Sequence, residues 1–298
     1  MKNLRFAILA MGIMAAANVG PSAYADSSDA ITLQQELLSV APKVSAFSIH
    51  DALPLEWERN HPERKLWSDY EYSVINDYFD ELNMAEDIVD YCPNYDKLAY
   101  DQKIQAWAQL FVGVSRWESS WDPTERTLEG NDLDPETGQK VYSDGLLQMS
   151  YQDVESTPYC PFSWQIDKTL SESDPHRTIF NPFNNLYCGI RTMADAIRDN
   201  VQDQNCHGAH KIVCNEYWST LDIHQPSHDK IPSIKAEMRN TLPFCGSRMK
   251  GQVFADDFTW FANLKVNREV VKVWRSTVGK AEDDIKNHKK KKEAPPAP

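Results

Sequence analysis

The residue that first suggests chemistry is Glu118, a carboxylate set among apolar residues. The apolar positions around it recur at steps of three and four, namely Ile104, Trp107, Phe111, Val114 and Trp121. This spacing predicts the buried face of a helix, and Glu118 falls on that face. Burial disfavours the charged form of a carboxyl group and raises its pKa. A carboxylic acid that keeps its proton near neutral pH can protonate the leaving oxygen of a glycoside.

A buried glutamate has a second interpretation, as one half of a structural ion pair. Arg116 and Arg126 lie close to Glu118 in the sequence and could supply the other half. The helical spacing does not decide between an acid catalyst and an ion pair, so both interpretations stay open at this point.

The segment after Glu118 is typical of a helix end followed by a return into the interior. Pro123 predicts that the helix stops just after Asp122, since proline disfavours helix at the residue before it. A polar loop follows, with a turn at residues 134–138. The chain returns at residues 143–150, where Gly145 allows a ligand or a backbone to approach closely. Ser150 and Asp153 then predict a new helix start.

Three short motifs in this order resemble those of soluble lytic transglycosylases and their goose-type lysozyme relatives. The first is ESSWDP at residues 118–123, and the second is SDGLLQMS at residues 143–150. The third combines Asn181-Pro182, Asn185-Leu186 and Gly189 at the start of a predicted helix. The resemblance covers roughly residues 105–200. It implies a lysozyme-like α+β fold, mostly helical, with a cleft between the end of the Glu118 helix and a small β-region.

The resemblance also implies roles for single residues. Glu118 is the expected acid, and Ser143, Gln148 and Met149 are expected to line the sugar sites. The family's later motif containing Ala-Tyr-Asn is missing, and we expect Tyr217, followed by Trp218, to stand in its place.

Further sugar contacts are expected from the residues themselves. Tyr151, Trp117 and Trp164 could stack on sugar faces, whereas Trp107 is assigned to core packing. Asp144 is placed near the cleft.

The implied substrate is the glycan strand of peptidoglycan, cut between N-acetylmuramic acid and (N-acetyl)glucosamine. A lytic transglycosylase needs one carboxylic acid, because the 6-hydroxyl of the muramic acid closes a 1,6-anhydro ring. A hydrolase needs a second carboxylate. Asp132, Asp134 and Asp144 are candidates, but aspartates in loops usually cap turns, so lytic transglycosylation is favoured. A non-catalytic wall-binding protein on the same fold is a further alternative, although it has no need of an acid on an apolar stripe.

The charge of the chain bears on its partners. The formal net charge is −13, and without the leader and the lysine-rich tail the body is near −19. Such a body should repel nucleic acid and anionic lipid. Acidic residues near the cleft could instead attract the free amines of de-N-acetylated peptidoglycan. The acidic alternation through residues 131–136 completes no calcium loop, so neither a metal nor a cofactor is expected.

The chain is predicted to divide into five segments. Residues 1–25 are typical of a signal peptide cleaved after Ala25, which predicts a secreted, periplasmic or extracellular protein without a transmembrane segment. Residues 26–95 form a helical N-terminal segment, with helical spacing around Asp69–Val89, and residues 96–245 form the catalytic domain. Residues 246–285 are a C-terminal extension packing on that domain. Residues 286–298 are a disordered Lys/Pro tail. We expect a monomer.

Six cysteines in an exported chain predict disulfides. Spacing cannot choose among the possible pairings, although Cys206 with Cys214 closes the shortest loop. A metal site with His207 and His210 is the alternative, but no standard zinc spacing fits.

Overall fold

The computed structural model describes residues 27–199, 210–214, 217–222 and 230–246. These residues belong to one compact unit that ends at Gly246. The predicted signal peptide, most of the C-terminal extension and the Lys/Pro tail lie outside the described residues. Among the described helices, none is long and apolar enough to cross a membrane.

The fold is α+β and mostly α, as predicted. The helices are α1 (Ser27–Ser39), α2 (Lys65–Asp77), α3 (Phe79–Leu82), α4 (Ile88–Tyr91), α5 (Tyr100–Ser119), α6 (Asp153–Ser156), α7 (Trp164–Asp167), α8 (Pro182–Arg198) and α9 (Ile231–Thr241). Two antiparallel strands, β1 (Arg126–Leu133) and β2 (Lys140–Asp144), form a hairpin. Short 3₁₀ helices, including η5 (Ser219–Leu221), join these elements.

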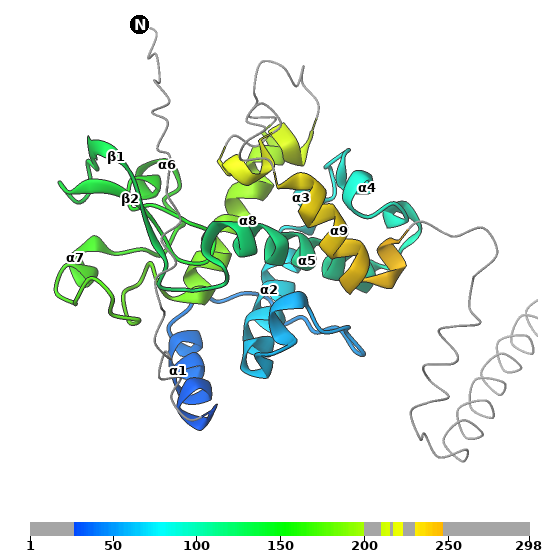
Figure 1. Cartoon of the computed structure of the whole chain (residues 1–298), viewed down its shortest axis with the longest axis horizontal. Helices are drawn as coiled ribbons and strands as arrows, with labels where there is room; N and C mark the ends of the chain where they lie inside the picture. Colours follow the sequence, from blue (N-terminus) through cyan, green and yellow to red (C-terminus); the bar gives the residue numbers. More distant parts are fainter. Residues whose placement is uncertain (1–26, 200–209, 215–216, 223–229, 247–298) are drawn as a thin grey trace, which may run out of the picture. The chain divides into compact units, whose positions relative to one another are not determined.

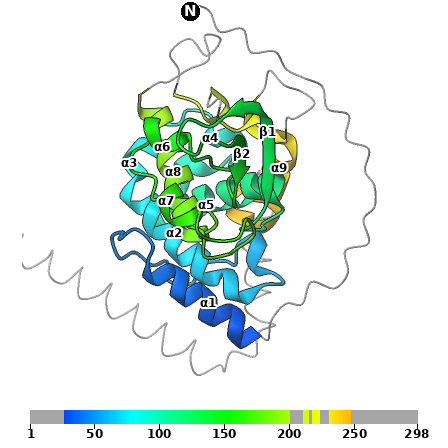
Figure 2. The same cartoon turned by 90° about the vertical axis from the view of Figure 1, so that its left-hand side faces the viewer.

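Helix α5 is the centre of the core. Helices α2 and α9 pack against it, and α8 packs against α2 (Figure 1 and Figure 2). The approach of α9 is close at Gly113, where an added Cβ would lie 2.9 Å from Ile234 Cγ2. The indole of Trp107 is fully buried and donates to the Tyr95 hydroxyl at 2.9 Å, which confirms its assignment to the core.

The N-terminal segment for which helical spacing was predicted, around residues 69–89, contains parts of three helices, α2, α3 and α4. Helix α2 begins at Lys65 and ends at Asp77, and Tyr78 separates it from the single turn of α3. Tyr78 has φ −116° and ψ 21°, outside the helical range, which interrupts the helix. The apolar side of α2 shares one buried cluster with α5 and α8.

The hairpin occupies the segment expected to be a polar loop. The expected turn at residues 134–138 is confirmed: the Asp134 carboxylate accepts the backbone N–H groups of Glu136 and Thr137 at 2.8 and 3.1 Å. The residues before it, however, pair with β2 from Arg126↔Asp144 to Leu133↔Lys140. Strand β1 is mostly exposed, so it lacks the apolar alternation by which a half-buried strand is recognised.

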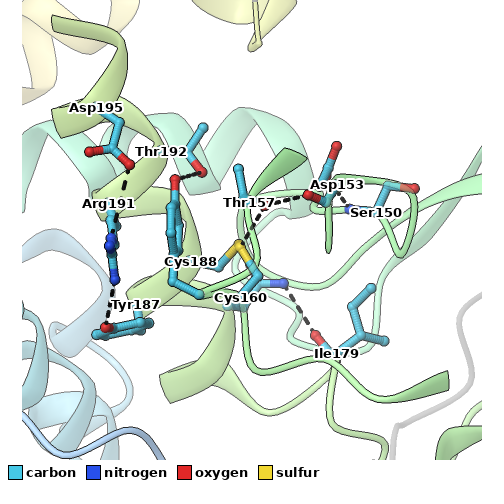
Figure 3. Close-up of a disulfide and its surroundings, with 12 residues drawn as sticks. Ser150, Asp153, Thr157, Cys160, Ile179, Tyr187, Cys188, Arg191, Thr192 and Asp195 are labelled. Atoms are coloured by element: carbon cyan, nitrogen blue, oxygen red, sulfur yellow. Dashed lines mark hydrogen bonds and ion pairs between the residues drawn. A yellow bond between two sulfur atoms is a disulfide. The ribbon is translucent and has the colours of Figure 1, made fainter. Parts of the chain in front are cut away.

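Two disulfides fasten the described chain, which confirms that cysteines are oxidised in pairs. Cys92 at the end of α4 is joined to Cys245, and Cys160 is joined to Cys188 of α8. Figure 3 shows the second bond, with the Thr157 hydroxyl 3.1 Å from the Cys160 sulfur. The predicted Cys206–Cys214 pair involves Cys206, which lies outside the described residues.

Candidate functional site

Glu118 lies in the last turn of α5, close to where the helix stops. The helix ends at Ser119, three residues before the predicted stop at Asp122, because Ser120 and Trp121 adopt left-handed φ values of 55° and 63°. Such values strain residues other than glycine. The Trp121 indole N–H donates to the Val112 carbonyl at 2.9 Å and stabilises this sharp turn.

The Glu118 carboxyl group is half-buried and has no ion pair with any described residue. Both nearby arginines are occupied elsewhere: Arg116 pairs with Glu237, and Arg126 lies 3.1 Å from Asp144. The structural ion pair considered from sequence is therefore not formed. Instead, the Thr220 hydroxyl of η5 donates a 2.6 Å hydrogen bond to Glu118.

The pKa of Glu118 is raised from 4.5 to about 7. Burial is the main cause, the Thr220 hydrogen bond opposes the rise, and the negative charge of Glu129 adds to it. The raised pKa expected from the apolar stripe is confirmed. At neutral pH a large fraction of the Glu118 side chain is a neutral acid able to donate a proton.

Glu129, like Thr220, is a residue of this site that the sequence reasoning missed. It lies on β1, its side chain is exposed, and its charge reaches both Glu118 and Tyr217. No local pattern marks this residue, because β1 is mostly exposed and lacks apolar alternation. The pairing of β1 with β2 brings it to the end of α5.

Tyr217, expected from the sequence to stand in for the missing motif, lies where the charges of Glu118 and Glu129 act on it. Its hydroxyl donates to Asp153, which also accepts the Ser150 N–H at 2.8 Å (Figure 3 shows the latter contact). Helix α6 begins at Asp153 with Gln152 as its N-cap, three residues after the predicted start at Ser150, whose hydroxyl caps no helix N–H. Burial, Asp153, Glu118 and Glu129 together hold the pKa of Tyr217 well above its ordinary value, so its phenol stays protonated.

The second motif forms a tight loop at residues 144–149, closed by a bridge between Asp144 and Met149. The Asp144 N–H donates to the Met149 carbonyl at 2.7 Å and the reverse bond measures 2.9 Å. Gly145 has φ 82° in this loop, and an added Cβ would lie 3.0 Å from the Ile179 carbonyl oxygen. Glycine is therefore required here for a close approach of backbone.

Three neighbouring elements hold this loop in place. The Asn185 side chain of α8 accepts from the Leu147 N–H at 2.6 Å and donates to the Asp144 carbonyl at 3.0 Å. The Ser119 hydroxyl donates to the Leu146 carbonyl at 2.9 Å, and the Trp218 indole donates to the Leu147 carbonyl at 2.8 Å. The first, second and third motifs thus meet as one hydrogen-bonded unit behind Glu118.

Several residues expected to contact sugar are buried in this loop. Asp144 and Met149 are fully buried, and Gln148 is 7 % exposed. The Gln148 amide donates to the Gly145 and Glu125 carbonyls at 2.9 and 3.3 Å. The structure therefore differs from the expectation that these side chains line a sugar surface, because the compact loop turns them inward. Ser143 stays half-buried on β2, opposite Thr127.

Tyr151 also differs from its expected stacking role. Its ring is 4 % exposed, and its hydroxyl donates to Asp167 at 2.6 Å. Of the other aromatic candidates, Trp164 is half-buried and packs against Tyr151. Trp117, with 40 % exposure, is the one that presents a large surface.

The candidate second carboxylates named from sequence occupy different environments. Asp134 caps its turn, as loop aspartates do, and Asp132 is exposed on β1. Asp144 is held beside Arg126, and burial raises its pKa to about 6 although Arg126 and Arg177 oppose the rise. Within the described ranges, no three His, Cys, Asp or Glu side chains are grouped to hold a metal.

Comparisons with known proteins give a distant likeness. No family model and no curated protein matches the chain. Three solved structures of Bd0314 DslA, a Bdellovibrio protein, are similar. The wild-type form 2 has 26% sequence identity and a TM-score of 0.49, over 65% of this chain and 98% of that one. Two Glu-to-Gln mutants of it have 24% identity and TM-scores of 0.49 and 0.46. At these values the likeness assigns no family to the chain.

Proposed function

We propose that this protein is a peptidoglycan glycosidase that cleaves the β-1,4 bond after N-acetylmuramic acid with Glu118 as general acid. The observation that carries the proposal is the state of Glu118. Its carboxyl group is half-buried, has no cationic partner among the described residues and has a pKa of about 7. Carboxyl groups with strongly raised pKa values are found preferentially at functional sites, where they serve as acids.

In the proposed reaction Glu118 protonates the glycosidic oxygen while the bond from that oxygen to the muramic acid C1 breaks. The Thr220 hydroxyl occupies one carboxyl oxygen at 2.6 Å and leaves the other oxygen to carry the proton toward the sugar. The Thr220 bond also stabilises the carboxylate that remains after proton transfer. Positive charge then develops at C1 and must be met by a nucleophile.

The choice of nucleophile distinguishes two reactions. The sequence favoured ring closure by the substrate's own 6-hydroxyl, because no second carboxylate was evident. Glu129 adds a candidate for the second carboxylate that hydrolysis needs, since its negative charge acts on Glu118. In a hydrolase, Glu129 would either deprotonate the attacking water or attack C1 directly.

Two measurements test the proposal. Purified sacculi are incubated with the wild-type protein and with Glu118→Gln, and the masses of the released products are measured by mass spectrometry. Turnover by the wild type and its loss in Glu118→Gln, with the fold retained by circular dichroism, are expected. Equal turnover by both proteins would reject Glu118 as the acid, and binding without any turnover would favour the wall-binding alternative.

The products also identify the reaction type, because hydrolysis adds a water that ring closure does not. Reducing ends, together with a large loss of rate in Glu129→Gln, are expected for hydrolysis. Products ending in 1,6-anhydromuramic acid, with activity retained in Glu129→Gln, would show that the reaction is lytic transglycosylation.

A further inference from the structure

Trp117, the neighbour of Glu118 in the sequence, is an exposed aromatic residue between two cations. Its side chain is 40 % exposed. Lys230 Nζ lies 5.2 Å from the centroid of its ring, and the Arg116 guanidinium carbon lies 5.9 Å from it. Cations attract the negative faces of aromatic rings at these distances. We call Arg116, Trp117 and Lys230 the cation–tryptophan cluster.

The cluster borders the candidate acid on two sides. Trp117 precedes Glu118 at the end of α5. Lys230 directly precedes α9, which packs against α5 (Figure 1). The Lys230 backbone N–H donates to the Thr220 carbonyl at 3.0 Å. The hydroxyl of the same Thr220 holds Glu118 at 2.6 Å. Thr220 therefore links Lys230 to Glu118 through two hydrogen bonds.

The two cations differ in their electrostatic state. Arg116 is half-exposed but already pairs with Glu237 of α9. Lys230 has no ion pair within the part of the chain that the structure describes. An uncompensated lysine beside the acid is unexpected in a body with a net charge near −19, where carboxylates are plentiful.

Packing alone accounts for other lysines on rings but not for Lys230. Lys103 lies over Tyr95 and Lys235 lies over Tyr91, and both tyrosines are buried. In those pairs the lysine stem covers a ring that belongs to the core. Lys230 instead stands over a ring that remains open to solvent, so both partners are available to a ligand.

We propose that the cation–tryptophan cluster is a subsite for the anionic peptide stem carried by the muramic acid of the substrate. This inference rests on the proposed function and names the part of the substrate that the site recognises. In it, the Lys230 ammonium binds a stem carboxylate, and the exposed face of Trp117 contacts the apolar part of the peptide.

The chemistry of the substrate places the stem within reach of the cluster. The muramic acid whose C1 is attacked carries the peptide stem on its own ring. The point where the stem is attached to the glycan therefore lies beside Glu118. A single cation there also offsets locally the repulsion between an acidic protein and an anionic wall. The cluster would then favour glycan that still bears peptides.

The test measures binding rather than turnover, using the Glu118→Gln protein with and without Lys230→Gln. Binding to intact sacculi is measured by sedimentation, and binding to soluble glycan strands from which an amidase has removed the peptides is measured by fluorescence anisotropy of labelled strands. Lys230→Gln is expected to weaken binding to intact sacculi about two- to fivefold, the range of an exposed ion pair. The difference should shrink as salt is raised.

Lys235→Gln is the matched control, because Lys235 also lies on α9 over an aromatic ring but pairs with Asp90 at 3.6 Å. Its binding to both materials should equal that of the parent protein. An equal loss on intact and peptide-free glycan in Lys230→Gln, or no loss on either, would overturn the peptide subsite. Absence of turnover in the wild type contradicts the proposed function separately, since the binding result does not depend on it.

Discussion

Replacement of Glu118 by glutamine should stabilise the protein, and the gain should depend on pH. The folded protein holds this carboxyl group with a pKa of about 7, against 4.5 for the ordinary group. Each unit of difference corresponds to about 1.4 kcal/mol between the two protonation states. The ionised Glu118 therefore destabilises the fold by as much as about 3 kcal/mol, and by less where water reaches the half-buried carboxylate.

The sign follows from proton linkage. Because the folded pKa is raised, the folded state binds the proton more tightly than the unfolded chain does. The contribution of Glu118 is fully favourable below pH 4.5 and is lost as the pH rises through 7. The glutamine side chain of the Glu118→Gln protein cannot ionise, although its amide oxygen can still accept the Thr220 hydrogen bond. The difference in unfolding free energy should be near zero at pH 4 and reach about 1–3 kcal/mol at pH 8.

The measurement is urea unfolding followed by circular dichroism at pH 4, 6 and 8, with the disulfides kept oxidised. Groups that titrate identically in both proteins cancel in the difference. Glu36→Gln, an exposed change on α1, serves as the control and should show no difference from the wild type. A wild type that is equally stable or more stable at pH 8 than Glu118→Gln would refute the reasoning, because Glu118 would then carry no destabilised charge.

Three further predictions concern the site and its supporting loop. In the residual activity of Glu129→Gln, the alkaline limb of the pH–rate profile should lie at lower pH than in the wild type, since the change removes a negative charge that raises the pKa of Glu118. Thr220→Val should move the same limb to higher pH, and shifts of both variants in one direction would contradict the assignment of causes. Asn185→Ala should lower the free energy of unfolding by about 2–4 kcal/mol in urea titrations, because it leaves the Leu147 N–H and the Asp144 carbonyl without partners, and a loss under about 1 kcal/mol would argue against the Asn185 contacts. De-N-acetylated peptidoglycan should be digested faster than a matched acetylated sample at low salt if the acidic hairpin attracts free amines, and equal rates would reject that preference.

The sequence by itself determined the features that depend on local spacing. The helix containing Glu118 follows from apolar residues at steps of three and four, and the raised pKa of Glu118 follows from its place on that stripe. The helix opened by Asn181-Pro182 was also predicted. In the structure Asn181 accepts the Phe183 N–H at its start, and proline fits the first helical turn.

The second motif was misleading about which of its side chains face solvent. The second motif suggested surface contacts for Met149 and Asp144, but the loop that it forms is closed and fully buried. Gly145 and Gln148, at φ 82° and 50°, turn the chain sharply enough to direct these side chains inward. A motif identifies which residues belong together, but it does not show which of them face solvent.

Only the tertiary structure decided which distant residues surround Glu118. Thr220 comes from a position 102 residues further along the chain, and Glu129 comes from a strand without apolar alternation. Lys230 is positioned by the packing of α9 on α5. None of these three has a local signal, because each is polar and joins the site through backbone pairing or helix packing. The acid could therefore be found in the sequence, whereas the groups that set its pKa and the cation beside it required the fold.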